Sequence, residues 1–334
     1  MKRIAGFTIL EFLIASTIGT LLIAGVGAVY LSNKATFTVQ EALARLQENG
    51  RYANYILSRE IRMAGFQGCT NQKQLALTNL VSNASTMLNY DKPLQGFDGN
   101  GASFSPSLPT NISAKQPLST SDVIEIRMAS NSVHLSTDMT QVSSPISVFS
   151  GLGAQSGMPL IITNCVLGDI FVAGTGTGDT SITHPTGVNT SNNLSTSYLA
   201  NAQVMRFIYY AFYVKNTGRV NNQNQPILAL VRLDANGNEE EIAEGVEELH
   251  VTYGVDTDND NTVNAYQTAA QVNSGNNWNN VISVQINLLL ATTENVADKA
   301  RPYTFNSATA TPTDRKIRRE WITFITLRNR GLPV

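Results

Sequence analysis

The feature that most constrains this chain is a long apolar run near its start, from Phe7 to Leu31. The run holds one formal charge, Glu11. About 25 residues of α-helix span roughly 37 Å, which exceeds the ~30 Å of a bilayer's hydrocarbon core. Lys2 and Arg3 precede the run, and the positive-inside rule keeps such a basic pair in the cytoplasm. The sequence therefore predicts one membrane span, with the rest of the chain outside.

The carboxylate in this span needs an explanation. An acidic side chain at such a position costs on the order of 2.5–3.5 kcal/mol on insertion scales and usually has a partner. No Lys or Arg lies within one helical turn of Glu11. Cleavage after Gly6 would give Phe7 a positive α-amino group one turn away, and the same amine on a neighbouring copy or related subunit would neutralise two charges in one contact. We therefore expect Glu11 to act in assembly.

A short basic leader precedes Gly6-Phe7-Thr8-Ile9-Leu10-Glu11, and the apolar helix follows. This arrangement resembles the type III signal of type IV prepilins. The resemblance implies cleavage between Gly6 and Phe7 by prepilin peptidase, N-methylation of Phe7, and a role for Glu11 in setting the register between subunits. It also implies a single-pass protein of the bacterial inner membrane with its head in the periplasm, which later joins a pilus fibre or its tip.

Two other interpretations of the N-terminus stay open. The first is a simple signal anchor, in which Glu11 has no role. The second is a conventional secretory signal cut after Ala28, because Val26-Gly27-Ala28 has the small residues that such a site needs. Against the second, the apolar run is longer than a usual secretory signal and contains a carboxylate.

Past Leu31 the pattern predicts that the helix continues to about Met63 as an amphipathic half. Small and apolar residues recur there every three or four positions, at Val39, Leu43, Leu46, Gly50, Ala53, Leu57, Ile61 and Ala64. We divide the chain into a leader (1–6), a membrane and assembly half of the helix (7–31), an amphipathic half (32–64) and a β-rich head (65–334).

The head reads as a succession of strands. Alternating or β-branched residues predict them at 122–128, 159–162, 169–173, 206–214, 227–233, 239–246, 249–255, 281–290 and 321–327. Turns are expected at Asn216-Thr217-Gly218 and Asn236-Gly237. The fold class is therefore α+β and pilin-like, with a mainly antiparallel sheet packed against the second half of the helix. Residues 174–201 have low complexity and predict an exposed, flexible loop with little to bury.

Two stretches at the end of the helix are Glu48-Asn49-Gly50-Arg51-Tyr52-Ala53 and the run from Arg59 to Cys69. Together they resemble the PilW family of minor pilins, and so does the order of segments from Ile227 to Asn329, whereas the likeness thins in 70–200. The family resemblance implies a minor pilin that helps to prime type IV pilus assembly and supports twitching motility and adhesion. It implies as partners other minor and major pilins, prepilin peptidase, the inner-membrane assembly platform and a tip adhesin.

The two cysteines, Cys69 and Cys165, fit an exported protein. Neither lies in a CxxC motif, so we expect one disulfide between them rather than a redox or zinc site. Closing a loop of about 100 residues contributes about 4 kcal/mol or more in the chain-entropy model. Two unpaired buried thiols are the alternative. The formal net charge of −2 gives no indication of nucleic-acid binding.

The best ligand-like cluster lies between two predicted strands. Carboxylates at alternate positions of a tight loop suit calcium, and the EF-hand spacing would use Asp256, Asp258, Asp260, the Thr262 carbonyl and Asn264. Asn261 stands where that motif has glycine, and Gln267 where it has a bidentate glutamate. A solvated Asp/Asn turn without a metal is therefore the alternative.

No arrangement of residues predicts an enzyme or a required cofactor. The three histidines, His134, His184 and His250, are far apart in the sequence, and no GxSxG, HExxH or Walker motif occurs. Besides the pilus function, two alternatives remain: a minor pseudopilin of a type II secretion system, and a membrane-anchored calcium-dependent adhesin.

Overall fold

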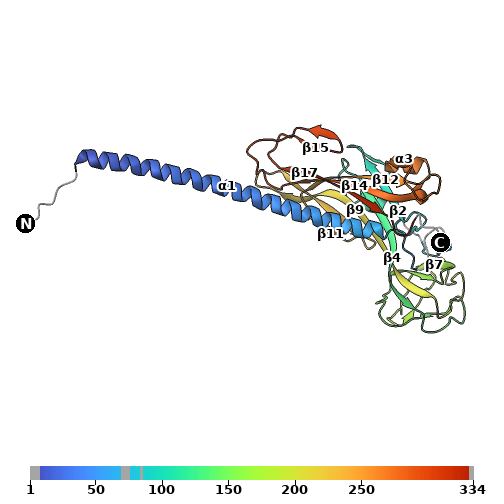
Figure 1. Cartoon of the computed structure of the whole chain (residues 1–334). Helices are drawn as coiled ribbons and strands as arrows, with labels where there is room; N and C mark the ends of the chain where they lie inside the picture. Colours follow the sequence, from blue (N-terminus) through green and yellow to red (C-terminus); the bar gives the residue numbers. More distant parts are fainter. Residues whose placement is uncertain (1–7, 69–75, 83–85, 331–334) are drawn as a thin grey trace, which may run out of the picture.

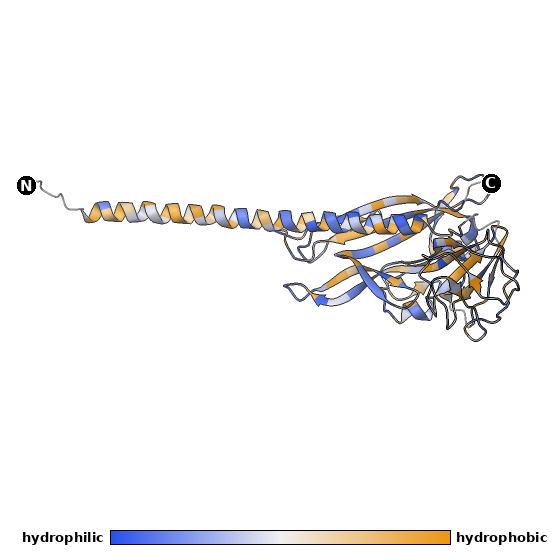
Figure 2. Ribbon diagram, turned by 90° about the horizontal axis from the view of Figure 1, so that it is seen from below, coloured by the Kyte–Doolittle hydropathy of each residue, from blue (hydrophilic) through white to orange (hydrophobic). Residues whose placement is uncertain are grey.

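The computed structural model describes residues 8–68, 76–82 and 86–330, and its dominant feature is helix α1, Ile9–Arg62 (Figure 1). The 54 residues of α1 span about 81 Å at the standard rise. The first half projects away from the head and is mostly apolar, and the second half, of mixed polarity, lies along the head (Figure 2). None of its most apolar stretch is buried by the rest of the chain, and by length and composition the helix is able to cross a membrane.

The head contains two larger sheets where the sequence predicted one. The first has nine strands, seven of them in the order β1-β7-β6-β9-β4-β2-β3, while β10 pairs with β9 and β11 pairs with β10. Its strands are β1 (Ala76–Asn79), β2 (Leu94–Gly99), β3 (Phe104–Ser105), β4 (Val123–His134), β6 (Pro159–Thr163), β7 (Leu167–Val172), β9 (Gln203–Val220), β10 (Pro226–Asp234) and β11 (Glu239–Glu244).

The second sheet has the order β13-β12-β14-β17. Its strands are β12 (Val246–Val255), β13 (Ala265–Gln267), β14 (Val281–Ala291) and β17 (Arg318–Thr326). Two small sheets of two strands each pair β5 (Ile146–Ser147) with β8 (Ser181–Ile182), and β15 (Tyr303–Phe305) with β16 (Ala308–Ala310). The short helices are η1 (Thr86–Leu88), α2 (Thr110–Ser113), α3 (Ala269–Ser274) and η2 (Trp278–Asn280). Pairing is mainly antiparallel, as expected, and β1 with β7 is parallel.

Strand β9 joins two lobes of the head. One of its edges pairs with β4, while along the other β6 pairs with its first residues and β10 with the residues from Tyr210 onward. The turn predicted at Asn216-Thr217-Gly218 lies inside this strand and is wrong by a few residues. The chain instead turns after Val220, where Asn221 accepts hydrogen bonds from the backbone of Gln223 and Gln225.

The second half of α1 is part of the main core. Its buried residues contact side chains from both large sheets, and they include Leu46, Ala53, Ile56, Leu57 and Ile61. The predicted stripe is confirmed from Leu46 to Ala64, whereas Val39 and Leu43 are only half-buried because the head ends at that level. The helix is therefore held between the two sheets by apolar burial, and each buried Leu or Ile side chain contributes about 1.5–3 kcal/mol.

The segment 174–201 differs from the prediction. It contributes β8 and buries Ile182, Leu194 and Tyr198 in a separate core of the distal lobe, which is built around β6 and β7. The buried Asp169 organises it by accepting hydrogen bonds from the Ser195 backbone and hydroxyl and from the Tyr198 hydroxyl, at 2.9, 2.5 and 2.7 Å. The polar segment 174–201 packs against the lobe because its hydrogen-bond donors are satisfied by the buried carboxylate of Asp169. Composition alone does not predict such an acceptor.

Gly50 explains the close approach of α1 to the second sheet. A Cβ atom at this position would lie 2.9 Å from Trp321 Cε2 and 3.2 Å from Leu290 Cδ2. Real Cβ atoms are almost never that close to a ring atom, so the indole or the helix would have to move. The glycine in the middle of the helix is therefore a packing requirement.

We expect Gly50→Val to destabilise the head of the full-length protein by about 1–3 kcal/mol, because it overpacks the contact with Trp321. Denaturant unfolding followed by the fluorescence of the two tryptophans measures this. Ala35→Val is the matched control, since Ala35 is exposed on the same helix, and it should cost less than about 0.7 kcal/mol. Equal stability of both variants would contradict the packing account.

Candidate functional site

The first candidate site is the start of α1, where Thr8 caps the helix and Glu11 is its third residue. The two form a capping box: the Glu11 backbone donates to Thr8 Oγ1, and the Thr8 backbone and hydroxyl each donate to Glu11 Oε2 at 2.9 Å. Gly6 and Phe7 lie outside the described residues, so cleavage between them and methylation of Phe7 stay predictions.

The capping box gives Glu11 a partner next to its own helix, which is a hydroxyl and a backbone N–H rather than the Lys or Arg that the sequence lacks there. The pattern Thr8-x-x-Glu11 before an apolar run is the sequence signature of such a box, and it was present to be found. Both donors of Thr8 use Oε2. Within the described part of the chain, no residue donates to Oε1. The carboxylate is therefore held in a fixed orientation with one oxygen free to accept from another molecule.

The remainder of the first half of α1 is an apolar surface without a cover in the monomer. Large side chains along it are more than half exposed, among them Ile9, Leu10, Phe12, Leu13, Leu21, Ile23, Val26 and Leu31. A Cβ added at Gly19, Gly25 or Gly27 would meet nothing within 4 Å. A contiguous apolar surface of this size marks contact with a membrane or with other helices.

The second candidate site is the loop between β12 and β13. Single oxygens of Asp256, Asp258 and Asp260 lie within 4.8 Å of one another, so the structure brings the three predicted carboxylates together. Asn261 has φ 66°, the left-handed conformation that glycine would supply in an EF-hand loop. The loop joins two strands, and Asn264 Oδ1 already accepts from the Thr257 backbone at 2.6 Å.

The hydrogen bonds inside this loop also fit the alternative interpretation, a solvated Asp/Asn turn without a metal. Burial raises the pKa of Asp256, but the backbone N–H groups of Asn261 and Asn259 donate to its two oxygens and outweigh burial, so its pKa is lowered. Asp260 accepts from the Thr262 backbone at 2.8 Å. The loop is thus ordered by its own amides, and calcium at Asp256, Asp258, Asp260, Thr262 and Asn264 stays a prediction.

The predicted disulfide falls partly outside the described residues. Cys69 is not among them, so its pairing with Cys165 stays a prediction. Cys165 has φ 72° and follows the end of β6, and it is not a free thiol.

The histidines do not form a joint site. His134 ends β4, His184 is buried in the distal lobe, and His250 lies in β12 of the other sheet. His250 is flanked by Asp122 and Glu248, each with an oxygen 3.4 Å from a ring nitrogen. Burial lowers the pKa of His250, but hydrogen bonds and charge interactions with these two carboxylates outweigh it and raise the pKa to about 9. His250 is therefore a charged, ion-paired sheet residue.

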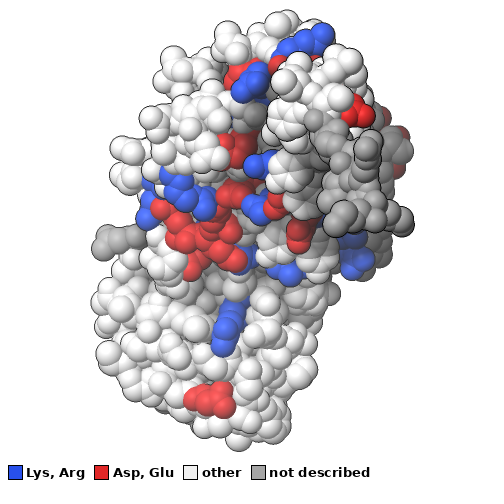
Figure 3. Space-filling view, turned by 90° about the vertical axis from the view of Figure 1, so that its left-hand side faces the viewer, with Lys and Arg blue, Asp and Glu red and all other residues white. Residues whose placement is uncertain are grey.

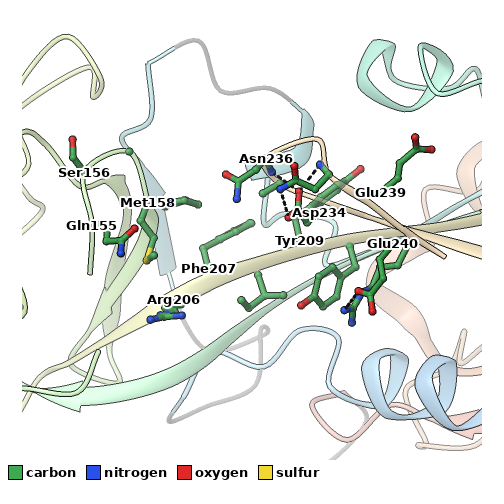
Figure 4. A pocket seen from close by; sticks show the side chains of 17 residues that line it. Gln155, Ser156, Met158, Arg206, Phe207, Tyr209, Asp234, Asn236, Glu239 and Glu240 are labelled. Carbon is green, nitrogen blue, oxygen red and sulfur yellow. Dashed lines mark hydrogen bonds and ion pairs between the residues drawn. The ribbon is translucent and has the colours of Figure 1, made fainter. Parts of the chain in front are cut away.

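A cavity of about 540 Å³ lies where β6 and β10 diverge along β9 (Figure 4). Its charged residues are engaged with the protein itself. Arg206 donates to the carbonyls of Leu152 and Gly153, and Asp234 accepts from the backbone of Asn236 and Asn238 at the predicted Asn236-Gly237 turn, which is confirmed. These hydrogen bonds stabilise the junction of the two lobes.

One comparison with known proteins bears on this structure. Residues 211–329, from the second half of β9 past the end of β17, match the family described as Type IV Pilus-assembly protein W (PilW). No curated protein and no solved structure matches the chain. The resemblance seen in the C-terminal part of the sequence is confirmed, whereas the pilin-like N-terminus and the segment from Glu48 to Cys69 lie outside the matched residues.

The His250 ion pairs predict how stability depends on pH. Because the pKa is about 9 in the folded protein and near 6.5 when unfolded, the charged ring stabilises the fold fully below pH 6.5, and this contribution is lost as pH rises through 9. His250→Gln should therefore flatten the fall in unfolding free energy between these values, which denaturant unfolding at a series of pH values measures. An unchanged slope would contradict the assignment.

Proposed function

We propose that this chain is a minor pilin, and the match of residues 211–329 to the PilW family of type IV pilus-assembly proteins supports this proposal. Prepilin peptidase cleaves it after Gly6 on the cytoplasmic side and Phe7 is methylated. The head lies in the periplasm until the subunit enters the pilus, at its tip or along the fibre. There it helps to start assembly, and so supports twitching motility and adhesion.

The observation that carries this proposal is the capped glutamate at the base of an uncovered apolar helix. A free carboxylate oxygen in a hydrocarbon environment favours a charged donor, since burying an unpaired charge is costly. The amine of a processed neighbour would be such a donor. The contact between Glu11 and this amine forms only when the neighbouring helix is shifted along the fibre by one subunit. Glu11 therefore selects how the two helices are aligned along their axes.

The partners that fit this role are other minor and major pilins, which would cover the apolar half of α1, and the peptidase and the inner-membrane platform, which would handle the subunit beforehand. A tip adhesin is a further partner. A minor pseudopilin of a type II secretion system would use the same helix in the same way. The PilW match favours the pilus.

The second candidate function is a membrane-anchored, calcium-dependent adhesin, and the observation that favours it is the three clustered carboxylates of Asp256, Asp258 and Asp260. No cofactor is needed for assembly in either case. Calcium would stabilise the head by binding the folded loop.

The assembly role predicts a graded effect of changes at Thr8 and Glu11. Glu11→Gln removes the charge that pairs with a neighbouring amine, so surface pili should fall by more than about tenfold, which corresponds to about 1.4 kcal/mol of coupling. Thr8→Val removes the hydroxyl that donates to Oε2 and accepts from the Glu11 backbone. It keeps the backbone donor of residue 8, so it should weaken assembly less. Thr8→Ser keeps the hydroxyl and should assemble as wild type.

Surface pili are counted after shearing, in a deletion strain complemented with each variant. Membrane insertion and the length of the processed chain are measured in the same cells as controls. Normal piliation by Glu11→Gln, with normal processing, would contradict the role of Glu11.

The calcium proposal is tested on the full-length protein in detergent. Bound calcium should raise the free energy of unfolding by about 2.7 kcal/mol at a hundred times the dissociation constant. Asp258→Asn with Asp260→Asn should abolish the effect, because these side chains are exposed. The backbone donors of Asn259 and Asn261 to Asp256 stay in place. Asp298→Asn, an exposed carboxylate paired with Arg301 elsewhere on the head, is the control. Neither heat on titration nor a shift in stability would dismiss the metal.

A further inference from the structure

One face of the second sheet carries an apolar patch that the proposed function leaves unused. It consists of Tyr266 on β13 and of Ile322 and Phe324 on β17, which are 41, 52 and 61% exposed. The opposite face of the sheet is buried against α1, where Trp321 meets Gly50. We call Tyr266, Ile322 and Phe324 the outer-face patch.

The three side chains form a continuous surface. Ile322 and Phe324 alternate with Thr323 on the outermost strand and so project from the same face. The Tyr266 and Phe324 rings meet edge to face, with centroids 5.7 Å apart. Tyr266 reaches across the sheet because its neighbour in the register is Gly254, and its hydroxyl lies 3.2 Å from Ser283 Oγ. The backbone thus holds the rings in one defined arrangement.

The rest of the same face is covered by the chain itself. The β15–β16 hairpin lies over it, with Phe305 packed on His250 at 5.4 Å and the Asn306 backbone donating to Glu320 at 2.8 Å. The hairpin ends before Phe324. The fold therefore covers one half of the face and leaves the half with the most apolar side chains bare.

The surroundings of the patch are acidic. Asp258 and Asp260 are exposed in the loop that leads directly into the strand of Tyr266. A cavity of about 230 Å³ is lined by Gln285 and Asn287, the register neighbours of Phe324 and Ile322. Its charged residues are Asp98, Asp122 and the positively charged His250, with no Lys or Arg among the described lining residues, so two carboxylates face one cation. The hydroxyl of Thr252, in the same wall, is buried without a hydrogen-bond partner in the described part of the chain. The complementary surface would be apolar at its centre and basic around it.

We propose that the outer-face patch is the docking surface for the head of a neighbouring pilin subunit, which inserts an apolar side chain framed by Lys or Arg. The proposal rests on the function proposed above, because helices packed side by side bring heads into contact. All three residues of the patch lie within residues 211–329, the part that matches the pilus-assembly family. An apolar anchor with a charged rim is the usual build of such an interface.

The distal lobe supplies a matched control. Phe149 is also 61% exposed, but it lies in the distal lobe, outside the matched residues. Replacing it removes the same ring at the same exposure from a different surface. A nonspecific loss of apolar surface would affect both positions alike.

The test uses full-length, tagged protein in cells that produce the other pilins. Phe324→Ser with Ile322→Ser should reduce the pilins recovered with it by more than about tenfold, since aromatic anchors carry most of an interface's energy. Membrane insertion and head stability should be unchanged, and surface pili should fall in parallel. Phe149→Ser should behave as wild type. With a chelator present, Asp258→Asn with Asp260→Asn should make the recovery less sensitive to salt.

Several results would overturn the proposal. One is normal recovery of pilins by the Phe324 and Ile322 double variant. Another is normal piliation with lost attachment to surfaces, which would assign the patch to a surface ligand. If Glu11→Gln abolishes pili while the double variant does not, the docking surface is wrong and the proposed function stands. If neither variant affects pili, both are wrong.

Discussion

The burial of the second half of α1 between two sheets is the interaction on which the rest of the structure depends. Leu46, Leu57 and Ile61 place one face of the helix in the main core, and Gly50 lets it approach the indole of Trp321. The same helix continues into the apolar half without a break. One continuous helix therefore links Glu11 to the head. In the proposed assembly, the packing of these helices would also decide which heads are neighbours.

Much of this arrangement follows from the sequence because helix periodicity is a local property. The stripe from Leu46 to Ala64 was visible in the spacing of its residues, and the extents of β4, β9 and β14 were visible in part. Which strands pair is not local. The division into two sheets, and the long β9 that crosses from one lobe to the other, depend on contacts between distant residues, and the pattern of single strands does not contain them.

Among the functional residues, too, local features can be predicted from the sequence and contacts between distant residues cannot. The assembly role of Glu11 stays a prediction. Its capping box with Thr8 is not predicted by looking for a cation near the carboxylate, because the partner is a hydroxyl and a backbone N–H. Asp256, Asp258 and Asp260 were correctly placed together, since five residues in a tight loop cannot separate far. The buried Asp169, which orders the segment up to Tyr198, gave no signal, because a carboxylate in a strand looks the same whether it is exposed or serves as a buried acceptor. The outer-face patch likewise cannot be predicted from the sequence, because it depends on the register between β12, β13, β14 and β17.

The two lobes of the head differ in chemistry. The distal lobe has almost no charged surface, as the lower half of Figure 3 shows, and its stretch from Met128 to Met205 contains no Lys or Arg. It also lies outside the matched residues, which include the helix-facing sheet and the outer-face patch. The match to the family model thus falls on the part of the head whose strands β11, β14 and β17 contact α1.

The central claim is that a short basic leader is removed and that the apolar rod then begins at Phe7. Intact mass measurement of the protein isolated from the membrane and from sheared pili tests this most directly. The account predicts a chain that starts at N-methylated Phe7 in both fractions. A chain that starts at Val29, or one that still carries Met1, would contradict it.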